Sequence, residues 1–300
     1  MRVSETQKKR KWKMINIPLM SEAAYRKLDE THIYASMLKT ICSSSSKHLK
    51  VEKKSDSMDF GTAVHMFILE PDKFDSNYIV CPDFKPLSQE MKEKYGSDTT
   101  HYSKTAEFKK QKADFEATIG TRTVLSQVDM ERLRQMRKSA KESNSELYKR
   151  FIEAGRAEVS VVVDEMPYMV NGKLVKAPSK ARIDNLVVEG DTMYIVDVKS
   201  CQSAKKHSFK YDSKKYGYDI QGAFYVDLAN EKFKNVVSQV RFLFLAIETQ
   251  APYLCSWFEM GEEMYNEGKA KIGSVIGEAI DVINGGEVKG YSSSYQIEVL

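Results

Sequence analysis

The amino-acid sequence predicts an α/β fold with a central mixed β-sheet flanked by helices, and three observations support this prediction. Helix-spaced apolar positions dominate the first 154 residues, whereas from Ala157 the pattern changes to the two-residue period of strands. Three strands then follow one another across short turns. A helix, a strand, a further strand and a closing helix complete the chain, an order typical of a layered α/β domain.

The N-terminal half is expected to be helical. Capping signals and apolar spacing place helices near 21–28, 35–41, 60–70, 126–143 and 147–154, and Pro71 should end the third. Residues 83–125 are lysine-rich and weakly periodic, so we interpret them as an insertion with one helix at 105–118. We expect a flexible basic arm at 1–20, a single domain over 21–290 and a tail at 286–300. The domain would comprise a helical region (21–154) and a sheet core (155–285).

In the C-terminal half, turn residues punctuate the strand-like segments. Asn171-Gly172 is a strong hairpin signal, and Gly190-Asp191 is a second two-residue loop because glycine adopts the positive φ that such loops require. The predicted elements are strands at 158–163, 182–188 and 192–199, a helix at 218–230, strands at 240–247 and 253–259, and a helix at 262–283.

The hairpin around Gly190-Asp191 carries the most informative side chains. Counting outward from this loop pairs Asp184 with Asp197, so the two carboxylates should face each other with Cβ atoms ~4.5–5.5 Å apart. Lys199 points to the same face as Asp197 because side chains alternate along a strand. A divalent cation held by both carboxylates would offset their repulsion, with the Lys199 ammonium beside it.

Two interpretations of this hairpin remain open from its own residues. Charged residues near hairpins are commonly solvated surface groups. However, 193–198 is apolar apart from Asp197, which predicts a central strand, and a carboxylate embedded there is costly without a partner.

Three residues on two predicted helices bear on this choice. His65 lies off the apolar stripe of its helix, on the side of Gly61, and is either a structural histidine or one directed into a cleft. Gln221 and Tyr225 are four residues apart and therefore share a helix face. Tyr225 could belong to the core, whereas Gln221 indicates a polar site, and both could contact a sugar-phosphate backbone or a base.

Composition sets broad limits. The chain is 42% hydrophobic and 29% charged with a net charge of +4, typical of a globular protein and too weakly basic to imply nucleic-acid binding by its sum. Basic runs at 8–11, 47–54, 104–112, 132–141 and 205–215 favour a polyanion partner when taken together. The scattered cysteines (Cys42, Cys81, Cys201 and Cys255) form no C-x-x-C pair and fit a reducing compartment. No membrane span or signal peptide is expected, so we predict a soluble, cytoplasmic protein without membrane association.

Together, these motifs resemble a known superfamily. Asp184 with Asp197-Val198-Lys199 resembles the metal site of PD-(D/E)XK nucleases, and F-G-T-A-V-H ending at His65 resembles the histidine-bearing helix of their RecB-like branch. Gln221-x-x-x-Tyr225 resembles the Q-x-x-x-Y motif of that branch. With 59–74 and the strand opening A-E-V-S (157–160), the chain is similar to RecE-type exonucleases, the exodeoxyribonuclease VIII family. Asp197 stands where the superfamily often has glutamate.

The resemblance implies a restriction-endonuclease-like core and assigns roles to individual residues. Asp184 and Asp197 would hold Mg²⁺ or Mn²⁺, with His65, the Val198 carbonyl and Glu158 as further ligands. Lys199 would orient the attacking water and offset charge on the phosphate. The resemblance also implies that Gln221 and Tyr225 are catalytic residues, which would position the DNA strand.

The same resemblance implies a biological setting. It predicts a double-strand exonuclease that degrades DNA ends 5′→3′ to 5′-mononucleotides and leaves 3′ single strands for recombination. The expected context is a ring-shaped homo-oligomer (trimer or tetramer), a RecT-type single-strand annealing protein as partner, and a bacterial cell in which the gene belongs to the host or to a phage. A structure-specific endonuclease or resolvase on the same fold stays open. A DNA-binding protein with a decayed site is disfavoured because the motif residues are all present.

Overall fold

The structure, a computed structural model, describes residues 20–51, 56–95 and 99–291. Nearly all of the basic arm expected at 1–20 lies outside these ranges, as does the tail from 292 onward. No helix in the described ranges combines the length and apolarity needed to cross a membrane.

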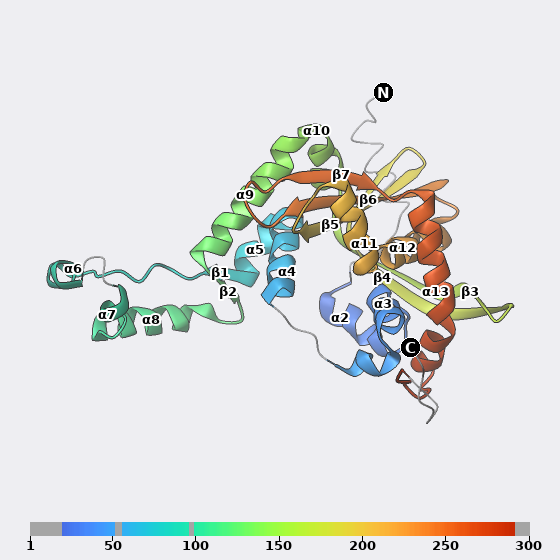
Figure 1. The fold of residues 1–300 in the computed structure, drawn as a ribbon, viewed down its shortest axis with the longest axis horizontal. Coiled ribbons are helices and arrows are strands. Elements are labelled where there is room, and N and C mark those ends of the chain that lie inside the picture. The colour runs from blue at the N-terminus through green and yellow to red at the C-terminus, as the bar shows by residue number, and fades with distance from the viewer. Residues whose placement is uncertain (1–19, 52–55, 96–98, 292–300) are drawn as a thin grey trace.

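A five-stranded mixed sheet forms the centre of the molecule, as the sequence predicts (Figure 1). Neighbouring strands are antiparallel except β5 and β6, which are parallel. Their order matches their order in the chain: β3 (Arg156–Val170), β4 (Lys173–Glu189), β5 (Thr192–Cys201), β6 (Gln239–Glu248) and β7 (Cys255–Glu259).

Helices cover both faces of this sheet. One face packs against α3 (Ala35–Ser43), α11 (Lys206–Lys215), α12 (Tyr218–Phe233) and α13 (Glu262–Ile283). The other packs against α4 (Asp56–Leu69), α5 (Pro71–Asn77), α9 (Gln127–Ser143), α10 (Ser145–Tyr148) and the π-helical turn η3 (Lys149–Glu153). Short segments α2 (Glu22–Arg26), η1 (Lys27–Glu30) and η2 (Ser46–Lys50) complete the N-terminal region.

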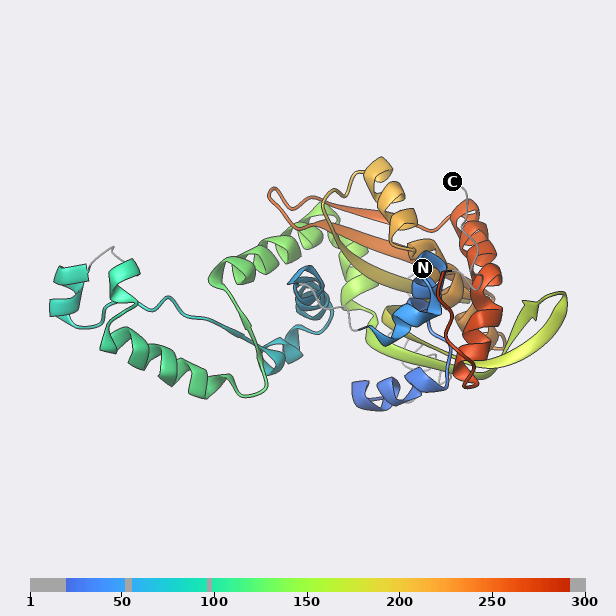
Figure 2. The same ribbon diagram turned by 60° about the horizontal axis from the view of Figure 1, so that its bottom comes forward.

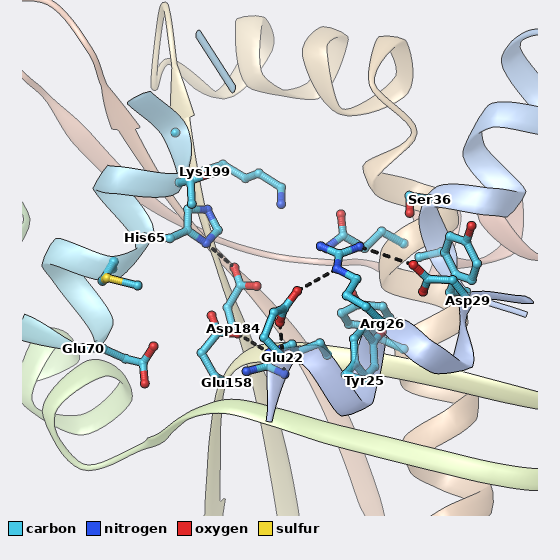
Figure 3. Close-up of a pocket in the computed structure, with 18 of the residues that line it drawn as sticks. Glu22, Tyr25, Arg26, Asp29, Ser36, His65, Glu70, Glu158, Asp184 and Lys199 are labelled. Carbon is cyan, nitrogen blue, oxygen red and sulfur yellow. Dashed lines mark hydrogen bonds and ion pairs between the residues drawn. The ribbon is translucent and has the colours of Figure 1, made fainter. Parts of the chain in front are cut away.

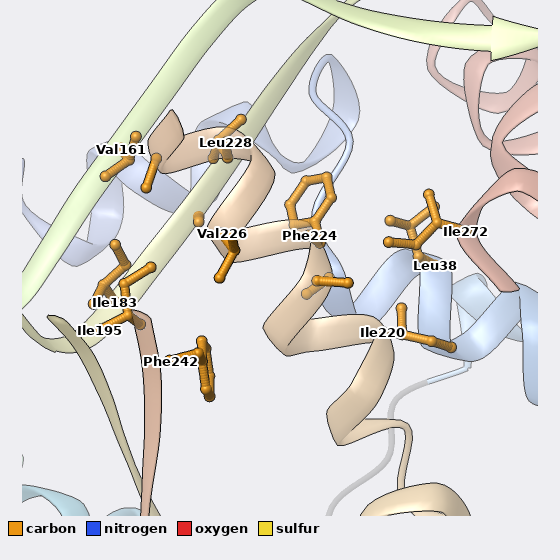
Figure 4. Close-up of a cluster of buried hydrophobic side chains, with 14 of the residues drawn as sticks. Leu38, Val161, Ile183, Ile195, Ile220, Phe224, Val226, Leu228, Phe242 and Ile272 are labelled. Carbon is orange, nitrogen blue, oxygen red and sulfur yellow. The ribbon is translucent and has the colours of Figure 1, made fainter. Parts of the chain in front are cut away.

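Strand alternation divides the apolar side chains of the sheet between two cores. Along β5, Met193 and Ile195 pack on the α12 side, whereas Tyr194, Val196 and Val198 pack on the α4 side. Figure 4 shows the first of these cores, where side chains of β4, β5 and β6 meet α12, α3 and α13. Because both faces of β5 are covered, the strand is central, as its apolar sequence predicts.

The lysine-rich insertion forms an arm that extends away from the sheet (Figures 1 and 2). It leaves and rejoins the body through the parallel pair β1 (Tyr78–Val80) and β2 (Thr123–Leu125). Tyr102 is buried inside this arm, and its hydroxyl donates a hydrogen bond to Glu107 at 2.8 Å. The predicted helix is confirmed as α8 (Ala106–Ile119), but α6 (Gln89–Tyr95) and α7 (Thr99–Tyr102) were not predicted, because such short polar helices carry no apolar period.

Most other predicted elements are confirmed, although β3 ends at Val170 rather than at 163, and three further differences are informative. The prediction that Pro71 ends a helix is correct, but Pro71 also opens α5, where its missing N–H costs nothing. β4 begins at Lys173 rather than at 182, because its polar first half pairs with β3 across the Asn171-Gly172 turn. Finally, α11 was missed because, among its ten residues, only Phe209 and Ser213 are buried.

Close contact between α12 and α13 depends on Gly268. A Cβ atom at this position would lie 2.2 Å from the Asp219 carbonyl oxygen and 2.9 Å from the Ala223 Cβ. We therefore expect Gly268→Ala to push α13 away from α12 and to lower the free energy of unfolding by about 1–3 kcal/mol. Urea denaturation measures the change.

Gly273→Ala is the matched control on the same helix. A Cβ at the exposed Gly273 meets nothing within 4 Å, so this change should stabilise by up to about 1 kcal/mol through helix propensity. Equal stability of the two alanine variants would show that the α12–α13 contact does not depend on Gly268.

Candidate active site

A cavity of about 810 Å³ lies where β3, β4 and β5 meet α2, α3, α4 and α12. Its walls bring together six of the residues singled out in the sequence: His65, Glu158, Asp184, Lys199, Gln221 and Tyr225. Figure 3 shows His65 from α4 and Lys199 from β5 above the Asp184 carboxylate, with Glu158 below. Asp197 is buried beside this cavity and contacts two of its lining residues.

The hairpin has the predicted register up to the two aspartates. Glu189 pairs with Thr192 across the loop, where Gly190 has a φ of +56°, and Asn185 pairs with Val196. The ladder ends there, so Asp184 and Asp197 are not a directly paired couple as the sequence predicted. Instead, the Val198 N–H donates to Oδ2 of Asp184 at 3.1 Å, which places a side-chain acceptor where the strands separate.

The neighbouring strand is irregular at the same level. Glu158 has a φ of +54°, and it is flanked by the pairs Ala157–Asn185 and Val159–Ile183 without being paired itself. A left-handed backbone at a residue other than glycine costs about 1 kcal/mol. The Glu158 carboxylate accepts from Nε of Arg182 at 2.6 Å, and burial raises its pKa in spite of this partner. This distortion turns Glu158 toward the cavity.

His65 and Asp184 form an ion pair, with Nδ1 and Oδ2 3.1 Å apart. Burial by itself would lower the pKa of His65, but the Asp184 carboxylate outweighs burial, so the pKa is raised above its ordinary value. Burial would likewise raise the pKa of Asp184, yet His65, Lys199 and the Val198 N–H together lower it. The pKa of Asp184 therefore lies below its ordinary value, which favours the ionised carboxylate.

Asp197 is held from both sides. Its Oδ1 accepts from Nε2 of Gln221 at 2.7 Å, and its Oδ2 lies 2.6 Å from the Lys199 ammonium. Burial, opposed by Lys199 and reinforced by Asp184, raises the pKa of Asp197. Burial would lower the pKa of Lys199, but the two aspartates outweigh it and raise that pKa. Lys199 thus stays cationic while it is in contact with Asp197.

Lys39 of α3 is a site residue that the sequence interpretation missed. Its Nζ lies 3.3 Å from Oε1 of Gln221, so the Gln221 amide accepts from Lys39 and donates to Asp197. Burial, followed by the nearby Lys199 charge, lowers the pKa of Lys39 to about 8. A sequence signal existed, since Lys39 is the one charged residue among the residues 35–41 predicted as a helix.

The remaining predicted residues occupy defined positions. Tyr225 lines the cavity, and burial raises the pKa of its phenol well above the ordinary value, so it stays protonated. The Val198 side chain lies in the core on the α4 side, and its N–H is used by Asp184. Its carbonyl as a metal ligand stays a prediction.

The carboxylate and imidazole groups of the site are ligands that suit a hard divalent cation, but they are not close enough together to form a complete metal site. The Asp184 carboxylate and the His65 imidazole line the cavity, and the Asp197 carboxylate, whose pKa is shifted in the opposite direction to that of Asp184, lies beside it. Among the described residues, however, no three His, Cys, Asp or Glu side chains are grouped closely enough to hold a metal ion as they stand. Binding of such a cation would therefore require the carboxylates and the imidazole to move closer together.

The fold and this site define the class of protein. A mixed sheet covered by helices, with one aspartate on each strand of a hairpin and a lysine two residues after the second aspartate, is the arrangement of PD-(D/E)XK nuclease-type domains. The chain belongs to the family described as a PDDEXK-like domain of unknown function (DUF3799), whose model matches residues 35–298.

One solved structure agrees at the level of the fold. A protein from Eubacterium rectale, described as a candidate exonuclease, superposes with a TM-score of 0.58 at 13% sequence identity, covering 93% of this chain and 92% of its own. A second structure, SSO0001, has a TM-score of 0.26 at 15% sequence identity, covering 80% of this chain and 85% of its own, which is too low to indicate the same fold. No curated protein sequence matches the chain.

The His65–Asp184 pair predicts a pH-dependent contribution to stability. Because folding raises the pKa of His65 above its ordinary 6.5, the folded state binds this proton more tightly than the unfolded state. The stabilisation is therefore complete below pH 6.5 and is lost as the pH rises through the folded-state pKa. We expect His65→Ala to lower the free energy of unfolding most near pH 6 and progressively less toward pH 9.

Urea denaturation of both proteins in EDTA across this pH range measures the difference. In an Asp184→Asn background, where the partner carboxylate is neutral, His65→Ala is the control and should produce no such pH-dependent difference. A His65→Ala deficit that stays constant from pH 6 to 9 would contradict a charged pair in the folded state.

Proposed function

We propose that this protein is a metal-dependent DNA exonuclease that degrades double-stranded ends 5′→3′ to 5′-mononucleotides and leaves 3′ single strands for recombination. One observation carries the proposal. Asp197 contacts both Lys199 and Gln221, and this group lies beside the His65–Asp184 pair at one cavity. Residues from four separate elements meet there, which an accidental surface D-x-K would not produce. The nuclease-type fold supports hydrolysis of a phosphodiester, and the candidate-exonuclease name of the E. rectale protein favours action at ends.

Each side chain has a role that follows from its charge state. The ammonium of Lys199 is kept protonated by the aspartates, so it can offset negative charge developing on the scissile phosphate. The Gln221 amide is fixed at both ends, by Lys39 and by Asp197, and so holds the second carboxylate in position. Tyr225, as a neutral phenol in the cavity wall, can donate to a phosphate oxygen.

Mg²⁺ or Mn²⁺ is part of this proposal. Asp184, Asp197 and His65 would hold the cation, with the Val198 carbonyl and Glu158 as further ligands. When bound, such a cation lowers the pKa of a coordinated water and neutralises phosphate charge. A ring-shaped homo-oligomer, a RecT-type single-strand annealing protein as partner and action in the cytoplasm of a bacterial or phage-infected cell belong to the proposed setting.

Action at ends can be distinguished from internal cutting with one substrate pair. With Mg²⁺ or Mn²⁺, a 3′-labelled linear duplex should release unlabelled mononucleotides from its 5′ ends first, while covalently closed circles of the same sequence stay intact. Gel electrophoresis and thin-layer chromatography follow both reactions. Comparable cutting of the closed circles would instead support the structure-specific endonuclease.

The role of Lys199 can be separated from binding. Lys199→Met removes the charge but keeps much of the side-chain volume, so we expect cleavage to fall at least about 100-fold. Metal affinity by calorimetry and DNA affinity by anisotropy should change by less than about threefold. Asp184→Asn, by contrast, should lose metal affinity as well as cleavage.

Lys234→Met is the matched control. This lysine is exposed and paired with Glu231 at the end of α12, away from the cavity, so cleavage should be unaffected. A Lys199→Met protein that cleaves at the rate of the Lys234→Met protein would refute the assigned role.

A further inference from the structure

The outward face of α11 adjoins the candidate site at its C-terminal end. Gly217, with a φ of +65°, ends the turn after α11, and a Cβ there would lie 2.9 Å from Cδ of Lys39. The next residue, Tyr218, has its ring centroid 4.9 Å from the Lys199 ammonium. The turn 216–218 therefore lies against both lysines of the cavity.

The faces of α11 are clearly divided. Phe209 and Ser213 point into the core, and Phe209 stacks on Phe258 with ring centroids 4.9 Å apart. On one side, Lys210 and Lys214 pair with Glu263 and Glu267 of α13 at 3.1 and 2.7 Å. Helical spacing leaves a third stripe facing outward, made of His207, Tyr211 and Lys215.

Two tyrosines on and next to this stripe are unusually exposed for aromatic residues. Tyr211 is 66% exposed and Tyr216 is 51% exposed. The Lys215 ammonium lies 5.2 Å from the Tyr216 ring centroid, and the Tyr216 and Tyr218 rings are 6.0 Å apart. Aromatic rings thus continue from the exposed stripe to Lys199. Figures 1 and 2 both place α11 on the outside of the body, next to α12.

Exposed rings interleaved with ammonium groups suit single-stranded nucleic acid better than duplex. Every base has a π-face that can stack on tyrosine, but in a duplex these faces are already stacked, so the surface selects unpaired nucleotides. Tyr211 lies in α11 and Tyr216 directly follows the last residue of this helix, so the two rings are about 7.5 Å apart along the helix axis and offer separate stacking surfaces to different bases. Lysines beside the rings complement the phosphates between the bases.

We propose that Tyr211, Lys215 and Tyr216 form a stacking track that binds the unpaired nucleotides of a DNA strand and directs that strand toward Lys199. The inference rests on the proposed function for the fate of the strand, but binding itself requires no hydrolysis. It assigns the preferred substrate: a duplex end with frayed or overhanging nucleotides, rather than a fully paired one.

The test is DNA binding in EDTA, where no hydrolysis occurs. Fluorescence anisotropy with a labelled single-stranded 12-mer should show about tenfold weaker binding for Tyr211→Leu and for Tyr216→Leu, since stacking is worth ~1–3 kcal/mol per base. Tyr211→Phe and Tyr216→Phe retain the rings and should bind within about twofold of the unmodified protein. A closed hairpin duplex should bind all five proteins alike.

Tyr291→Leu is the matched control, because Tyr291 is 76% exposed and packs beside His48, not at the cavity. Its single-strand affinity should be unchanged. A 2-aminopurine base in the 12-mer should be quenched by the unmodified and phenylalanine proteins and not by the leucine proteins, which reports stacking rather than a structural effect.

Equal single-strand affinity of the leucine variants and the unmodified protein would overturn the track, as would equal losses for the phenylalanine and leucine variants. Unchanged DNA affinity together with a changed mass in light scattering would show instead that the face binds a second copy of the chain. The experiments distinguish a failure of the nuclease proposal from a failure of the stacking-track proposal. Tyrosine-dependent binding by a protein that hydrolyses no DNA refutes only the nuclease, whereas hydrolysis with tyrosine-independent binding refutes only the track.

Discussion

The burial of two neighbouring carboxylates is the constraint on which the rest of the site depends. Asp184 and Asp197 repel each other in a poorly hydrated region, so each must have partners that offset both desolvation and repulsion. The structure supplies different ones: His65 and the Val198 N–H for Asp184, and Lys199 with Gln221 for Asp197. This asymmetry lowers the pKa of one carboxyl and raises that of the other. Two aspartates of identical chemistry thereby acquire pKa values that are shifted in opposite directions.

The partners of these two carboxylates come from helices on both faces of the sheet. α4 delivers His65 and α12 delivers Gln221, so the strands between them must separate enough for side chains to meet across the sheet. The ladder ending at Asn185–Val196 and the left-handed Glu158 provide that opening. The packing of α12 on α13 at Gly268 then fixes the position of Gln221 relative to Asp197. The geometry of the site therefore depends directly on how the core helices pack.

The N-terminal segment is attached to the sheet by buried charge rather than by a large apolar contact. Lys180 is fully buried, donates to the Tyr25 carbonyl at 2.6 Å and pairs with Asp29, while Arg182 pairs with Glu22 at 3.2 Å. Leaving the fully buried Lys180 ammonium without its partners would cost several kcal/mol, so its contacts with Tyr25 and Asp29 hold α2 and η1 in a defined place. They complete the cavity wall opposite His65, as Figure 3 shows.

The sequence by itself determined the mixed α/β architecture, the hairpin register around Gly190-Asp191 and the order of the motif residues. These features have local causes: apolar period, turn chemistry and the fixed alternation of strands. Only the tertiary structure decided that the ladder ends before Asp184, that Lys39 enters the site, and that the exposed Tyr211 and Tyr216 lie at α11 near Tyr218, whose ring contacts Lys199. Such contacts join residues as distant as Lys39 and Gln221, and they arise from how whole elements pack, which no local pattern of residues specifies.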